Sequence, residues 1–216
     1  MDILFILIGI AGFALAIIIH EVAHGLIADR LGDPTARLAG RLTLNPIPHI
    51  DIYGTIVVPL LLFFFHSPFL FGWARPVPID PYNLKNPKKD AALISLAGPL
   101  ANIAFAILLA IFLRILLILF PSGIFFGLFF NLIDINLILA IFNLIPIHPL
   151  DGGKILVGIL PDIEARELDA FMNRFGMIFL FFLIFPIFGG TSLISPIMSP
   201  VINFFLRILI PGFSTI

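Results

Sequence analysis

Two histidines and a glutamate near the end of the first apolar run could bind and use a metal ion. The residues read His20-Glu21-Val22-Ala23-His24. Side chains four apart lie on one face of a helix, one above the other. Two imidazoles so placed can bind one Zn²⁺, and Glu21 can act as general base on a metal-bound water. The alternative is a polar helix end, although three ionisable groups so close together are costly in a long apolar helix.

A third ligand is expected from the segment between Asn143 and Gly153. A catalytic zinc takes three protein ligands and keeps one position open, and the chain has no cysteine. Asp151 follows an apolar helix whose end Pro146 and Pro149 should unwind, and Gly152-Gly153 permits a sharp turn after it. We predict that Asp151 is the third ligand. A helix-capping aspartate is the alternative.

The other histidines have less defined roles. His148, three residues before Asp151, could be a ligand or support one. His49 lies in a polar loop that we expect near the cytoplasmic face of the membrane. For both, a loop histidine without a metal role is the alternative. His66 stands alone in an apolar run, beside Ser67-Pro68, and we interpret it as the tip of a segment that turns back.

The composition places these residues in a membrane protein. Of the 216 residues, 60% are hydrophobic and 12% are charged, whereas a soluble domain is about half apolar and about a quarter charged. No soluble fold of this size could bury so much apolar surface. The net charge of -1 gives no indication of a nucleic-acid partner.

The apolar runs predict an all-α polytopic membrane protein with about five transmembrane helices. These runs are 3–28, 91–119, 124–145, 175–190 and 197–210. We expect one domain, 1–216, with a catalytic core at about 3–155 and C-terminal helices at about 175–212.

The polar loops set the expected topology. Ten of the twelve Lys and Arg residues lie in 29–51, 74–90 and 146–174, and basic loops face the cytoplasm. The run 52–73 has both flanks on that side, so we predict that it is re-entrant; an ordinary span is the alternative. Arg41-Leu42-Thr43-Leu44 alternates in polarity, which predicts a short strand-like element.

Four stretches of the sequence resemble the site-2 protease family of intramembrane zinc metalloproteases, in matching order over residues about 10–155. They are His20–His24, Gly40-Arg41-Leu42-Thr43-Leu44-Asn45-Pro46, Ala97-Gly98-Pro99-Leu100-Ala101-Asn102, and Asn143…Pro146…Asp151-Gly152. His148 departs from the family pattern, in which a second proline is common. We expect a minimal form, without the substrate-selecting soluble domain that many relatives carry.

The resemblance implies a three-helix catalytic core and one zinc ion per chain. It implies His20, His24 and Asp151 as metal ligands, with Glu21 as general base and later proton donor. It also places Asn143 and Asn102 near the active site as candidate substrate-binding residues, and Asn143 is the better candidate. The family's sheet-like element, thought to present a strand edge to an unwound substrate, corresponds to residues 41–44 and 52–73.

The sequence therefore predicts a zinc-dependent intramembrane endopeptidase, a multi-pass membrane protein with its active site toward the cytoplasmic side. The expected partners are the lipid bilayer and a membrane-embedded protein or peptide substrate. One alternative is an inactive relative that acts as a membrane-protein binding module. A metal or ion transporter is another, although transporters distribute polar groups across the bilayer and often have repeated halves.

Overall fold

The computed structural model describes residues 3–64, 74–120, 125–185 and 192–210. Within these ranges every regular element is a helix, which confirms the all-α prediction. The longer helices are α1 (Ile3–Leu31), α4 (Pro87–Leu119), α5 (Phe126–Asn143), α6 (Asp151–Ile159), α7 (Asp162–Ile184) and α8 (Ser195–Leu209). The shorter ones are α2 (Thr35–Leu38), α3 (Val58–Phe64) and single helical turns at Ile47–His49, Ile52–Val57 and Pro81–Asn83.

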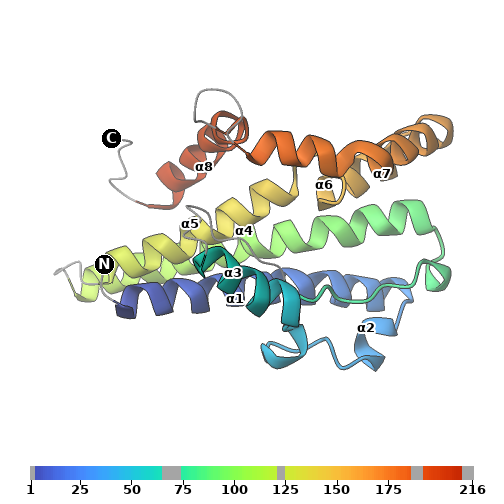
Figure 1. Cartoon of the computed structure of the whole chain (residues 1–216). Coiled ribbons are helices and arrows are strands. Elements are labelled where there is room, and N and C mark those ends of the chain that lie inside the picture. Colours follow the sequence, from blue (N-terminus) through green and yellow to red (C-terminus); the bar gives the residue numbers. More distant parts are fainter. Residues whose placement is uncertain (1–2, 65–73, 121–124, 186–191, 211–216) are drawn as a thin grey trace.

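Helices α1, α4 and α5 lie side by side and form the centre of the molecule (Figure 1). Helix α4 packs along both α1 and α5 and also contacts α6. Helix α8 contacts α5 and α7 contacts α6, so the C-terminal helices lie on the side of the bundle away from α1. The arrangement matches the three-helix core that the family resemblance implies.

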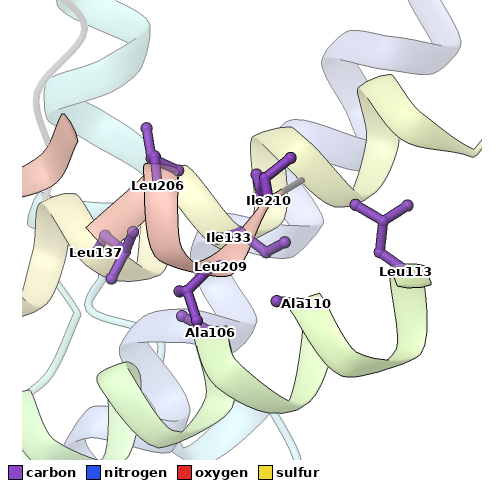
Figure 2. Packing of buried hydrophobic residues seen from close by; sticks show 8 residues of the cluster. All are labelled: Ala106, Ala110, Leu113, Ile133, Leu137, Leu206, Leu209 and Ile210. Carbon is purple, nitrogen blue, oxygen red and sulfur yellow. The ribbon is translucent and has the colours of Figure 1, made fainter. Parts of the chain in front are cut away.

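Small side chains on α4 allow α4, α5 and α8 to pack closely (Figure 2). Ala106 and Ala110 of α4 face Ile133 and Leu137 of α5, and these side chains are buried. The cluster is completed by Leu113, Leu206, Leu209 and Ile210. Between apolar membrane helices such packing is stabilised by van der Waals contact, which small residues allow by bringing the backbones close together. This packing fixes α4 against α5, the two helices that support the site described below.

Three of the helices that the structure describes are long and apolar enough to cross a membrane: Ile8–Leu31 within α1, and the whole of α4 and α5. Helix α8 is apolar but has only 15 residues. Helix α7 carries all of its charged residues in its first half, 162–174. The predicted total of about five spans therefore stays a prediction for these last two helices.

The strand-like element predicted at Arg41–Leu44 is wrong, because these residues form bends and not a strand. The Arg41 guanidinium donates to the Pro48 carbonyl, and His49 Nε2 donates to the Thr43 carbonyl over 2.9 Å. These side-chain hydrogen bonds fold the loop on itself and give its backbone an alternative to a sheet.

The predicted re-entrant segment 52–73 is helical where it is described, at Ile52–Val57 and in α3. Residues 65–73, which include the expected tip at His66, lie outside the described residues. At the base of the segment the Arg75 N–H donates to the His49 carbonyl over 2.9 Å. His49 and Arg75, which flank the segment, therefore lie side by side.

Candidate metal centre

His20 and His24 of α1 meet Asp151 at the start of α6. Asp151 Oδ2 lies 3.0 Å from His20 Nε2 and 3.2 Å from His24 Nε2. Among the residues that the structure describes, this is the group whose ligand atoms could hold a metal ion, all within 4.8 Å of one another. A tetrahedral zinc with bonds of about 2.0 Å separates its ligand atoms by roughly 3.3 Å, so small shifts would accommodate the ion.

Both rings are hydrogen-bonded through Nδ1 on their far sides, so that Nε2 is the nitrogen that faces Asp151. His24 Nδ1 donates to the Ile94 carbonyl over 2.6 Å, and a carbonyl can only accept. His20 Nδ1 lies 2.7 Å from Asn102 Oδ1, which is also an acceptor. With the proton on Nδ1, both Nε2 lone pairs point at the Asp151 carboxylate. Three facing acceptors repel one another unless a proton or a metal ion lies between them, and two imidazoles with one carboxylate are ligands that zinc accepts.

Asn102 does not face the cavity as a substrate-binding residue would. It is fully buried in α4, where its amide nitrogen donates to the Ala16 carbonyl and to Asn136 Oδ1, each over 2.9 Å. Its oxygen is therefore turned toward His20. The sequence predictions did not include Asn136, although it lies seven residues before Asn143, two helical turns away on the same face of α5.

Glycines bring the backbone close to the site. Gly98 of α4 lies against the tips of both histidine rings, and a Cβ there would enter the space between them. Asp151 is the first residue of α6. A Cβ on Gly152 would collide with the Leu144 and Ile145 carbonyls, so this glycine is required for close packing.

His148 supports the Asp151 loop and stands apart from the metal group. It is buried, and its Nε2 lies 3.0 Å from Asp169 Oδ1 of α7. Its backbone carbonyl packs against Gly176 of α7, where no Cβ would fit. His49 is also buried, and it holds the 41–49 loop through the Thr43 carbonyl. For both, the structure favours the alternative without direct metal binding.

Glu21, the predicted general base, lines the same cavity as the three candidate ligands. The cavity measures about 190 Å³. Its wall includes Asn143 and an extended segment, residues 74–80. The Val77 N–H of that segment donates to Glu21 Oε2 over 2.9 Å. Since Pro76 and Pro78 have no N–H, Val77 is the backbone donor at this point.

Asp33 anchors the 74–80 segment to the end of α1. It is fully buried and accepts from the Asp80 N–H over 2.7 Å and from Asn83 Nδ2 over 2.9 Å. It also accepts from the N–H and hydroxyl of Thr35. Burial alone would raise the pKa of Asp33, but these hydrogen bonds outweigh it and hold the pKa below its ordinary value.

Replacing Asp33 by asparagine should lower the free energy of unfolding by about 1–3 kcal/mol at neutral pH, because buried donors lose their acceptor. A carboxylate with a depressed pKa stabilises the fold above its unfolded pKa of about 3.9, and this contribution is lost as the pH falls through the folded pKa. The difference in thermal midpoint between wild type and Asp33→Asn should therefore shrink below about pH 4. Light scattering of the detergent-solubilised proteins on heating would measure it.

Asp29→Asn is the matched control for this prediction. Asp29 lies at the same end of α1 but pairs with the exposed side chain of Arg37, over 3.0 Å. Exposed ion pairs contribute about 0–1 kcal/mol. If the two variants lost equal stability, Asp33 would not be an anchor.

Comparisons with known proteins agree with the chemistry of this site. Residues 121–186, which include Asp151, match the model of peptidase family M50. YwhC of Bacillus subtilis, named as a candidate zinc metalloprotease, is 36% identical over 194 residues, which cover 85% of this chain and 80% of YwhC. Rip2 of Mycobacterium tuberculosis, named in the same way, is 31% identical over 171 residues, which cover 79% of this chain and 64% of Rip2. No solved structure matches the chain.

Proposed function

The chain belongs to peptidase family M50, the site-2 protease family, and from this premise we propose that it is a zinc-dependent endopeptidase that cuts peptide bonds within the membrane. Three apolar helices long enough to span a bilayer make it an integral membrane protein. The family names support a metalloprotease. Intramembrane action and the residue roles below are our proposal.

One observation carries the proposal: His20, His24 and Asp151 converge at the cavity that Glu21 also lines. The ligand atoms come from two helices far apart in the sequence, α1 and α6, and the hydrogen bonds on Nδ1 leave both histidines facing Asp151 with Nε2 as an acceptor. A base beside such a group is the arrangement used to hydrolyse amides. A structural metal site would use four protein ligands and would not need the base.

Zinc, when bound, would polarise the scissile carbonyl and make a coordinated water more acidic. His20, His24 and Asp151 would hold the ion. Glu21 would accept the proton from the attacking water on its carboxylate and later pass it to the leaving amine. Asn143 lines the cavity and is the candidate for contact with the substrate carbonyl.

The site is proposed to open toward the cytoplasm. The end of α1, the start of α4 and the charged half of α7 gather at one end of the molecule (Figure 1). These regions and their loops carry most of the basic residues, which favours the cytoplasmic side. The hydrogen bond between Arg75 and His49 supports a re-entrant course for 52–73, since a segment that returns to its start need not cross the bilayer. We propose that residues 1–216 form a single membrane domain.

Removal of zinc provides the test. Purified protein in liposomes should cut a fluorogenic peptide that spans the bilayer, and a zinc chelator should reduce the rate to background. Dialysis and one equivalent of zinc should restore the rate. A soluble peptide with the same scissile sequence serves as the comparison that tests whether cleavage takes place within the membrane.

Each outcome bears on a different part of the proposal. Cleavage that survives removal of all zinc would overturn the metalloprotease. Cleavage of the soluble peptide alone would overturn intramembrane action. Zinc transport into the liposomes without proteolysis would favour a transporter.

A further inference from the structure

We propose that Asn136 of α5 is a positioning residue for the metal site. It acts through Asn102 to keep the proton of His20 on Nδ1, so that Nε2 stays free to bind the ion. The inference rests on the proposed function, because it takes the ion to be a catalytic zinc. It adds α5 to the set of elements that prepare the ligands.

The orientation of each asparagine side-chain amide follows from a backbone carbonyl, which can only accept a hydrogen bond. Asn136 Nδ2 donates to the Leu132 carbonyl of its own helix over 2.8 Å. Its oxygen is therefore left to face Asn102, whose Nδ2 donates to it over 2.9 Å. Asn136 thus presents an acceptor to α4 in a fixed direction.

Asn102 transmits this direction to His20. Its two N–H groups are both used, one by Asn136 Oδ1 and the other by the Ala16 carbonyl of α1. Its oxygen must then face His20 Nδ1, at 2.7 Å. An oxygen in this place requires the N–H on Nδ1 of the neutral ring, since one ring nitrogen donates and the other accepts.

Burial makes the chain of hydrogen bonds effective. Asn102 and Asn136 are both 0% exposed, and His20 is 5% exposed. Water therefore cannot replace a lost partner, and a reversed Asn102 amide would set its oxygen against the Ala16 carbonyl and its nitrogen against His20 Nδ1–H. Without Asn136, only the Ala16 carbonyl would oppose that reversal. The reversed amide favours the His20 tautomer with the proton on Nε2, which cannot bind a metal there.

The zinc affinity of purified full-length protein, measured by competition with a chromogenic chelator, tests this role. Asn136→Leu should weaken zinc binding roughly ten- to hundredfold, the usual effect of losing a residue that orients a metal-binding histidine. Asn136→Ala, which removes the amide without adding bulk, should show the same loss. Asn136→Asp keeps an oxygen facing Asn102 and should retain most of the affinity. Asn131→Leu, on the exposed face of the same helix, is the matched control and should bind zinc as the wild type does.

A double-mutant cycle separates this role from general support of the fold. If Asn136 acts through Asn102, the pair Asn102→Ala and Asn136→Leu should lose no more affinity than Asn102→Ala alone. Across these variants, the thermal midpoint of the metal-free protein should not fall in parallel with the zinc affinity. Additive losses, or wild-type affinity in Asn136→Leu and Asn136→Ala, would overturn the role of Asn136 but would leave the proposed function standing. A wild-type protein that binds no zinc would overturn the proposed function as well.

Discussion

Replacing Glu21 by glutamine is expected to abolish cleavage while one zinc ion per chain remains bound. The amide has the shape of the carboxylate and can still accept from the Val77 N–H, so the cavity should keep its form. It cannot take a proton from the attacking water at neutral pH. Loss of a general acid–base group lowers kcat by about 10²–10⁴-fold. Initial rates on the membrane-spanning peptide and elemental analysis of the same samples measure the two quantities.

Glu164→Gln provides the control for this change. Glu164 is exposed near the start of α7, so its charge can be removed without touching the cavity, and both rate and zinc content should stay as in the wild type. Wild-type cleavage by Glu21→Gln would exclude Glu21 as the base. Loss of zinc from that variant would instead show that Glu21 holds the ion.

The sequence was sufficient to predict the residues of the candidate metal group that the structure brings together. His20 and His24 are four apart in a helix, and helical geometry alone places them on one face. Asp151 required more, because its approach to α1 depends on the order of the apolar runs and on the loop after α5. The expected topology predicted this approach, because the intervening segments return to the same side of the membrane and bring the end of α1 near the start of α6.

Residues that act through several partners could not be predicted in this way. Asn136 is one of four polar residues in α5, and only the packing of α5 on α4 shows that it faces Asn102. Asp33 resembles any turn aspartate until its four donors are seen together. The strand predicted at 41–44 failed for a related reason. Alternation in four residues is weak evidence beside side chains such as Arg41 and His49, which can satisfy the backbone within the loop.

Replacing Gly98 by alanine is expected to remove zinc binding without unfolding the protein. A Cβ at this position would lie 2.5 Å from His24 Cε1 and 2.6 Å from the Nε2 atoms of both His20 and His24. The groups that must move are ring tips, so the fold can accommodate the methyl group by turning the rings. Alanine is also favoured over glycine in a helix by about 1 kcal/mol. We therefore expect an unchanged or raised thermal midpoint together with a zinc affinity lowered by at least about 100-fold, since both ligand atoms are displaced.

Gly127→Ala separates this effect from that of any glycine replacement in a membrane helix. Gly127 lies in α5, and a Cβ there would meet nothing within 4 Å, so zinc binding should be unchanged. In Gly98→Ala the rings can turn only at the expense of their hydrogen bonds, because His20 Nδ1 is bonded to Asn102 and His24 Nδ1 to the Ile94 carbonyl. Moving either Nε2 away from the methyl group must strain one of these bonds or lose the ligand. Wild-type zinc affinity in Gly98→Ala would mean that the ion does not bind between these two rings, and the assignment of His20 and His24 as ligands would fail.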